Sequence, residues 1–228
     1  MNEAQTLRRD QRDAMVMAAL PHVPFDGWSD ACLRRAATDA GLGADAVVRL
    51  FPDGARGAVV HFMDMADRLM AADLATRDLT VLKIRERIAT AVRVRLERWN
   101  PHREAIRRAL ALVPLPSMTG PALRGWYHTV DVIWREIGDR ATDFSFYTKR
   151  MLLAGVYGAT LLYWLDDRSE GAAATWAFLD LRIADVMRIP KVRARLAAQL
   201  KHVPRPSDLL RRLATGPSRG WSARTPRR

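Results

Sequence analysis

The stretch of chain from residue 59 to residue 74 has the sequence VVHFMDMADRLMAADL. Its apolar residues recur at intervals of three and four, at Val59, Met63, Ala66, Met70 and Leu74. Because an α-helix makes one turn in about 3.6 residues, this spacing places them along one helical face. The stretch therefore predicts a helix that packs one side against a core.

The same spacing returns in a second stretch, at Val81, Ile84, Ile88, Val92 and Leu96. Charged residues interrupt it, as expected of a solvent-facing side, at Glu86, Arg87, Arg93 and Arg98. No stretch of useful length alternates apolar and polar residues with β-branched enrichment, which is the pattern typical of strands. The prediction is an all-α fold.

Proline, glycine and capping residues mark the expected helix ends. They predict about nine helices through Arg188. The boundaries are expected at Pro21 and Pro24, at Ser29 with Asp30, at Gly41 and Gly43, at 52–54, at Asn100-Pro101, at 114–121, near Gly138, at 169–171 and at Pro190. The predicted divisions are an N-terminal part (1–54), a helical body for ligand binding and dimerisation (55–189), and a basic tail (190–228).

The positive charge of the chain is concentrated in this tail. The whole chain has 37 basic and 25 acidic residues, a net charge of +12. Residues 191–228 contain 11 basic residues and one acid, Asp208, so the rest of the chain carries only +2. Such asymmetry predicts an anionic partner, nucleic acid or a lipid surface, at the C-terminal end.

Composition excludes several other classes of protein. The single cysteine, Cys32, cannot form an internal disulfide. The first residues are polar and carry both signs of charge, which is not the pattern of a signal or transit peptide. The longest uncharged run without proline, 151–165, is shorter than the roughly 20 residues that a membrane-spanning helix needs. We expect this run to be a core helix, buried on every side.

The sequence contains no signature of catalysis. Motifs for zinc, di-iron, nucleotide phosphates and nucleophilic serine are absent. We expect structural or surface roles for the five histidines and a helix-end or loop role for Asp166-Asp167. No metal, cofactor or enzymatic activity is predicted, and a catalytic role in a pathway is the less favoured alternative.

The segment 14–54 resembles the helix-turn-helix head of the TetR-type repressors. Its matching packing positions are 18–20, Leu33, Ala36, Ala37 and 40–42. A DNA-reading helix needs cationic side chains, yet 42–56 carries Arg49 and Arg56 against Asp45 and Asp53. We therefore expect that the helix-turn-helix scaffold is retained but its DNA-binding surface is lost. The chain is not expected to bind nucleic acid. A TetR-type regulator that senses a lipid-like ligand is the alternative.

Residues 142–150, with the sequence TDFSFYTKR, carry a second resemblance. They resemble the run Thr-Asp-x-Asn-Trp-Tyr-Thr-(Arg/Lys)-Arg of a ubiquinone-biosynthesis accessory family, the ninth named protein of the coenzyme Q pathway. Ser145 and Phe146 stand where that family has Asn and Trp. Further matches lie at 24–28, 83–85, 101–105, 130–134, Gly138-Asp139, Tyr157, Thr160, Trp164, Asp166-Asp167 and 175–179.

This resemblance implies a TetR-like helical bundle that binds an isoprenoid quinone precursor and presents it to the demethoxyubiquinone hydroxylase. The implied partner surface comprises Asp131, Ile133, Trp134, Asp143, Phe146, Tyr147 and Arg150. For the lipid, the predicted contacts are Met151, Leu152, Val156, Tyr157, Leu161, Trp164 and Trp176. Periodicity alone does not distinguish a pocket lining from ordinary core at these positions. A homodimer is also expected.

The basic tail has the composition of an amphipathic segment that lies on an anionic membrane. Its predicted membrane contacts are Val192, Leu196, Leu200, Leu209, Leu210, Leu213, Arg211 and Arg212. A nucleic-acid-binding tail and a solvated disordered tail are the alternatives. The implied location is cytoplasmic, at the inner face of the cytoplasmic membrane of a bacterium.

Overall fold

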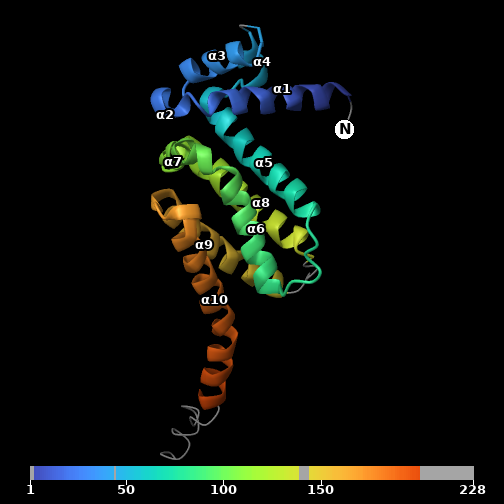
Figure 1. Ribbon diagram of the computed structural model, residues 1–228, viewed down its shortest axis with the longest axis vertical. Helices are drawn as coiled ribbons and strands as arrows, with labels where there is room; N and C mark the ends of the chain where they lie inside the picture. Colours follow the sequence, from blue (N-terminus) through green and yellow to red (C-terminus); the bar gives the residue numbers. More distant parts are fainter. Residues whose placement is uncertain (1–2, 44, 139–143, 201–228) are drawn as a thin grey trace, which may run out of the picture. The chain divides into compact units, whose positions relative to one another are not determined.

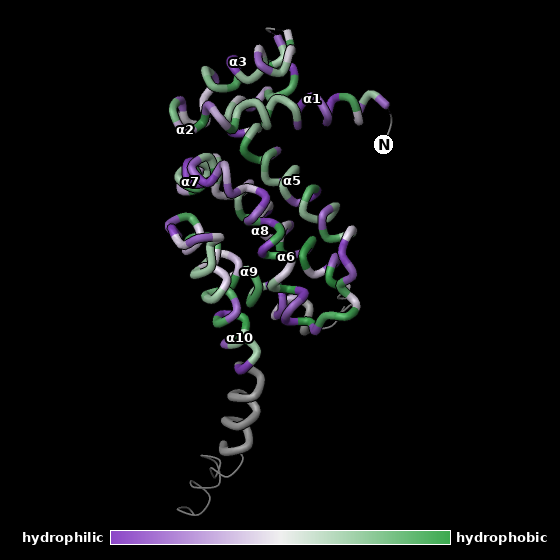
Figure 2. The backbone as a smooth tube through the Cα atoms, in the orientation of Figure 1, coloured by the Kyte–Doolittle hydropathy of each residue, from purple (hydrophilic) through white to green (hydrophobic). Residues whose placement is uncertain are grey.

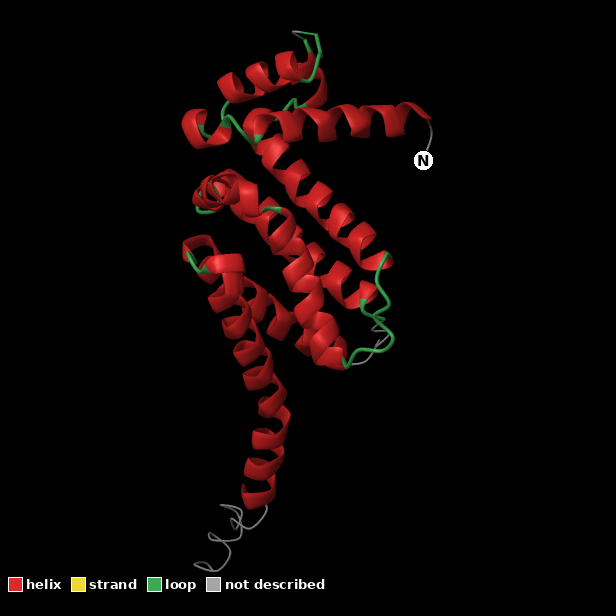
Figure 3. Cartoon of the chain, in the orientation of Figure 1, coloured by secondary structure: helices red, strands yellow, loops and turns green. Residues whose placement is uncertain are grey.

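The computed structural model describes residues 3–43, 45–138 and 144–200. Every regular element in these ranges is a helix (Figure 3), which confirms the all-α prediction. The chain divides into two units, Met1–Ile183 and Ala184–Arg228. None of the helices described is long and apolar enough to cross a membrane.

The first four helices form a compact head, residues 3–50, in which α1 packs on α3 (Figure 1). They are α1 (Glu3–Ala19), α2 (Val23–Asp26), α3 (Asp30–Asp39) and α4 (Ala46–Leu50). As predicted, Ser29 caps α3 by accepting a hydrogen bond from the Cys32 amide. Burial, followed by the nearby Asp26 carboxylate, raises the pKa of the Cys32 thiol to about 11, so this thiol stays protonated and unreactive.

The remaining helices, with α10 only up to Ile183, form the body of the first unit, where α5 packs on α8 and α8 on α9. They are α5 (Gly54–Ala75), α6 (Ile84–Arg98), η1 (Asn100–His102), α7 (Arg103–Ala111), α8 (Pro116–Glu136), α9 (Phe144–Asp166), η2 (Glu170–Ala172) and α10 (Ala173–Leu200). Hydrophobic and hydrophilic residues follow one another closely along α5 (Figure 2), as its amphipathic spacing predicts.

Two prolines expected at helix boundaries, Pro121 and Pro190, lie inside helices. The α8 helix begins at Pro116, where proline is tolerated because the first residue of a helix needs no amide donor. The helix continues through Pro121 near its N-terminal end, where the missing amide removes only one backbone hydrogen bond. The α10 helix likewise continues through Pro190. Val81, expected to start an apolar stripe, lies exposed before α6, which begins at Ile84. Lys83 caps this helix, and its amide donates to the Glu86 carboxylate in the first turn.

Aromatic packing joins the head to the body. Phe62 of α5 lies edge-on to Trp99, with ring centroids 4.8 Å apart. Trp28 also packs against Phe62, with ring centroids 5.9 Å apart. The Trp28 indole donates a hydrogen bond to the Ala105 carbonyl over 2.9 Å. The Trp28 side chain therefore connects the loop after α2 with both α5 and α7.

A polar network supports the same junction where α1 crosses α5. Asp13 of α1 lies 2.6 Å from the buried His61 and 2.7 Å from Arg68, both on α5. Burial, followed by the positive charge of Arg12, lowers the pKa of His61, so the imidazole is neutral at pH 7. A neutral histidine can donate to Asp13 while Arg68 supplies the opposite charge.

The C-terminal end of α9 is held by arginines of α7. Arg103 donates to the carbonyls of Trp164 and Asp167 at 2.9 and 2.6 Å, and Arg107 donates to that of Leu165 at 2.7 Å. The carbonyls of Trp164 and Leu165 lie in the last turn of α9, where a helix leaves its carbonyls without intrahelical partners. The cationic donors bind these carbonyls and complement the helix dipole.

The expectation that 151–165 is buried on every side is wrong. Met151 is 71% exposed and Leu162 is 62% exposed, although Trp164 in the same run is fully buried. The run packs one side in the body and leaves the other on the surface of the chain.

Two glycines of α9 offer a matched test of this packing. A Cβ at Gly158 would lie 2.9 Å from the rigid Trp126 ring, whereas one at Gly155 would meet nothing within 4 Å. We expect Gly155→Ala to raise the free energy of unfolding by up to about 1 kcal/mol through helix propensity. Gly158→Ala should lower it by about 1–3 kcal/mol through overpacking. Chemical denaturation measures both, and equal effects would contradict the described contact.

Candidate functional site

The body of the first unit encloses a cavity of about 460 Å³ between α5, α6, α7, α8 and α9. Each helix contributes apolar side chains, because each turns its apolar stripe inward. They include Phe62 and Met63 of α5, Trp99 after α6, Leu110 of α7, Trp126 of α8 and Leu161 of α9. Such a lining suits a ligand that is itself largely apolar.

Two leucines on the lining are also strongly exposed and therefore mark the mouth of the cavity. Leu123 of α8 is 65% exposed and Leu162 of α9 is 62% exposed. Leu115, next to the lining residue Pro114, is exposed as well. Apolar residues at the mouth allow an apolar ligand to enter without passing a polar rim.

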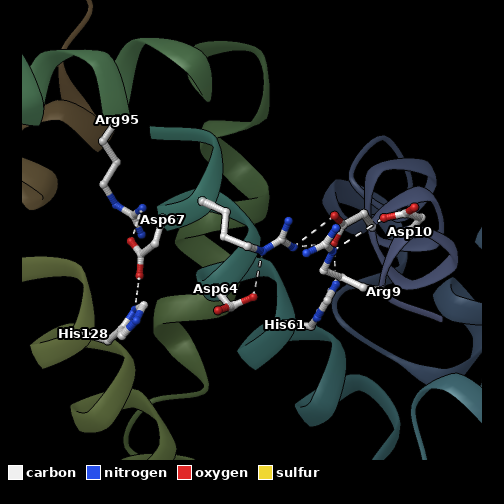
Figure 4. Close-up of polar contacts among 9 residues, drawn as sticks. Arg9, Asp10, His61, Asp64, Asp67, Arg95 and His128 are labelled. Atoms are coloured by element: carbon white, nitrogen blue, oxygen red, sulfur yellow. Dashed lines mark hydrogen bonds and ion pairs between the residues drawn. The ribbon is translucent and has the colours of Figure 1, made fainter. Parts of the chain in front are cut away.

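The polar side chains of the lining gather around one buried ion pair. Arg95 of α6 lies 2.5 Å from the Asp67 carboxylate of α5. Its other two nitrogens donate to the Tyr157 hydroxyl at 2.9 Å and to the Thr129 hydroxyl at 3.3 Å. Asp67 also lies 3.0 Å from the His128 imidazole, so that it stands between Arg95 and His128 (Figure 4).

This cluster keeps the Arg95 guanidinium charged inside the protein. Asp67 is only 1% exposed, and a lone buried carboxylate would be costly. Burial by itself works against the charge of Arg95, but Tyr157 and Asp67 outweigh it and raise the pKa of the guanidinium. A fixed positive charge therefore stands in the otherwise apolar wall.

The structure separates the predicted lipid-binding residues. Tyr157 and Leu161 line the cavity. Val156 and Trp164 are buried elsewhere in the core, and the Trp164 indole donates to Asn100. Leu152 is half-buried, Trp176 is buried and donates to the Gly171 carbonyl, and the exposed Met151 does not line the cavity.

Most of the lining comes from helices that sequence reasoning did not assign to a site. Arg95 and Asp67 carried a usable signal, because each is a charged residue at a position of an apolar stripe. Ile106, Leu110 and Val113 of the α7 region carried none, because residues that line an apolar cavity have the same composition as residues that fill a core.

The predicted partner surface is also divided. Tyr147 is 65% exposed, and the Lys149 ammonium lies over the ring of the buried Trp134. Ile133 has no exposed surface and is a core residue, so its side chain is not available to a partner. Arg150 is buried and donates to Asp131 at 2.8 Å, which joins α9 to α8. The side chains of Asp143 and Phe146 lie outside the described residues.

None of the predicted membrane contacts can be placed. The side chains of Val192, Leu196 and Leu200, and all of Leu209, Leu210, Arg211, Arg212 and Leu213, lie outside the described residues.

Asp167 has the helix-end role expected of it. Its carboxylate accepts hydrogen bonds from Ser169 and from the amide and hydroxyl of Thr175 in the first turn of α10. Burial opposes ionisation, but these hydrogen bonds prevail and hold the pKa of Asp167 well below its usual range. Within the described ranges, no three His, Cys, Asp or Glu side chains are grouped as metal ligands.

The buried ion pair and an exposed one join the same two helices, which gives a controlled test. Arg95→Met should lower the free energy of unfolding by about 3–5 kcal/mol, because it strands the Asp67 charge. Arg98→Met, which removes the half-exposed bridge to Asp73, should cost at most about 1 kcal/mol. Adding Asp67→Leu to Arg95→Met should recover much of the loss. Urea unfolding measures all three, and similar costs for Arg95 and Arg98 would contradict the described burial.

Comparison with known proteins finds a matching family model and similar relatives of the chain. The family model described as COQ9 matches residues 119–190, which cover α8, α9 and part of α10. The mitochondrial ubiquinone biosynthesis protein COQ9 of Rattus norvegicus is 32% identical over 182 residues, covering 77% of this chain and 58% of the rat protein. The protein of the same name from Drosophila melanogaster is 32% identical over 193 residues, covering 82% and 59%.

The chain thus spans less than two thirds of the length of these relatives. Among solved structures, a TetR transcriptional regulator from Nitrosomonas europaea superposes with a TM-score of 0.63 at 20% identity. The match covers 77% of this chain and 97% of the regulator, and it confirms the TetR-like fold. Together with the family match, these findings confirm the resemblance inferred from the sequence: the chain has a TetR-like fold and is similar to the COQ9 ubiquinone biosynthesis proteins.

Proposed function

We propose that this protein is a non-catalytic accessory protein of ubiquinone biosynthesis that binds an isoprenoid quinone precursor. The single observation that carries the proposal is the apolar cavity of about 460 Å³ between α5 and α9. Its volume lies in the range of small-molecule pockets. Relatives named for ubiquinone biosynthesis support the choice of an isoprenoid among apolar ligands.

The proposed role is to present this lipid to the demethoxyubiquinone hydroxylase at the membrane. An apolar ligand resists transfer through water because of its hydrophobic surface. A cavity with an apolar mouth removes that cost. The exposed Tyr147 at the start of α9 supports a partner surface there, since exposed aromatic side chains are enriched at protein interfaces.

The charges of the head favour this role over DNA binding. Arg49 is engaged by Asp45 at 3.3 Å and by Gln11 at 3.1 Å. Arg56 lies 2.5 Å from Asp53, and Arg35 lies 3.0 Å from Asp26. Phosphate binding would have to displace these carboxylates, which weakens the case for a transcriptional regulator.

We further propose peripheral attachment to the membrane through the basic tail, on the inner face of the cytoplasmic membrane. The net charge of +10 in residues 191–228 supports this attachment. Each basic residue contributes about 1 kcal/mol near an anionic leaflet. A homodimer is part of the proposal.

Native mass spectrometry of the protein purified from cells tests the lipid. We expect an adduct whose extracted mass is that of an isoprenoid quinone precursor. Leu161→Trp, which fills the cavity, should abolish the adduct, whereas Met151→Trp on the exposed part of α9 should retain it. Retention by both variants, or an adduct of unrelated chemistry, would refute the proposed ligand.

Sedimentation with vesicles tests the tail. The full chain should sediment with phosphatidylglycerol-containing vesicles and not with phosphatidylcholine alone, and salt should weaken the binding. A chain that ends at Ile189 should stay in the supernatant while circular dichroism shows that its helices persist. Undiminished sedimentation of the shortened chain would rule out the tail as the anchor.

A further inference from the structure

The hydroxyl of Tyr157 stands at the polar wall of the cavity. Its side chain is 5% exposed and lines the cavity from α9. The oxygen accepts a hydrogen bond from Nε of Arg95 over 2.9 Å. Arg95 in turn is fixed by Asp67 and Thr129, so the direction from which the Tyr157 oxygen is approached is set by the cluster.

A phenolic hydroxyl both accepts and donates a hydrogen bond, and only its accepting side is used here. Among the described residues none accepts the Tyr157 proton. Leaving a buried donor unpaired costs free energy comparable to a lost hydrogen bond. Because Arg95 donates to one lone pair of the oxygen, the hydroxyl proton points away from Arg95.

The aromatic ring of Trp126 lies beside the Tyr157 hydroxyl donor. The ring of Trp126 packs against that of Tyr157 with centroids 4.8 Å apart, and both residues line the cavity. Gly158 permits this approach, because a Cβ there would lie 2.9 Å from the Trp126 ring. A planar ring bearing an oxygen atom can contact the indole while its oxygen accepts from Tyr157.

We infer that Tyr157 donates a hydrogen bond to a ring oxygen of the ligand, so that the cavity selects an oxygenated prenyl ring over a hydrocarbon of the same shape. This inference rests on the proposed isoprenoid ligand. The ring lies against Trp126 and the Arg95 cluster, and the apolar chain extends along the leucines toward the mouth. Tyr157 is a specificity-determining residue in this arrangement, whereas Asp67 and Thr129 act by positioning Arg95.

Two ligands and two variants of the full chain test the inference. The ligands are ubiquinone with two isoprene units and geranylbenzene, which carries the same tail on a ring without oxygen. The Kd for the quinone is measured from the fluorescence of Trp99 and Trp126, which line the cavity, and that for geranylbenzene by competition. Tyr157→Phe should weaken quinone binding roughly three- to tenfold, the value of one neutral hydrogen bond, and change geranylbenzene binding less than about twofold.

Tyr163→Phe is the matched control, because it deletes the same hydroxyl from the same helix at a residue that stacks on Phe178 and does not line the cavity. It should change neither affinity. Should Tyr157→Phe fold poorly, the wild-type chain still provides the test, since it should prefer the quinone to geranylbenzene at least about threefold.

The outcomes separate the inference from the proposed function. Equal affinity of the wild-type chain for both ligands, or no effect of Tyr157→Phe on quinone binding, would overturn the inference and leave isoprenoid binding intact. Failure of the wild-type chain to bind either ligand would overturn both. An equal loss of affinity for methyl oleate, whose carbonyl is on an ester, would overturn the assignment to a ring oxygen.

Discussion

The carboxylate of Asp67 is the constraint on which the rest of the body depends. It is buried on α5, and a charge in that position must be matched by partners from the helices around it. Arg95 supplies the opposite charge from α6, and Thr129 and His128 approach from α8. Through Arg95 the cluster reaches Tyr157 on α9. Four helices that share few other polar contacts are thereby held in one register, and the cavity is the space that this register leaves between their apolar stripes.

The head and the body of this TetR-like fold differ in the kind of side chains that they present. A TetR-like fold shows how the helices pack, but function depends on the residues placed upon it. In the head the arginines bond to neighbouring carboxylates and the aromatic contact through Trp28 ties the loop after α2 to the body. In the body the helices enclose an apolar space with one polar wall. The cavity and its polar wall therefore lie in the body, although the fold is TetR-like.

Sequence reasoning predicted the helices well because apolar spacing and capping residues are local signals. The stripe from Val59 to Leu74 and the cap at Ser29 needed no knowledge of the rest of the chain. Pro121 led to a wrong helix boundary, because the free energy that a proline costs a helix depends on its distance from the helix start. The cavity was only partly predicted, through Tyr157 and Leu161. Whether an apolar residue such as Leu110 fills or lines a space depends on neighbours from distant helices, and no periodicity records them.

The capping of α9 by Arg103 and Arg107 has a consequence for how the cavity accommodates a guest. The α7 helix is one wall of that cavity, and it cannot separate from α9 without breaking three hydrogen bonds from its arginines to backbone carbonyls. Adjustment to a guest of different shape therefore falls to side chains. Met63 and Met118 face the cavity from α5 and α8, and unbranched thioethers change rotamer at little cost. The contact between α7 and α9 is thus fixed by hydrogen bonds, whereas the lining can change its shape through the rotamers of the two methionines.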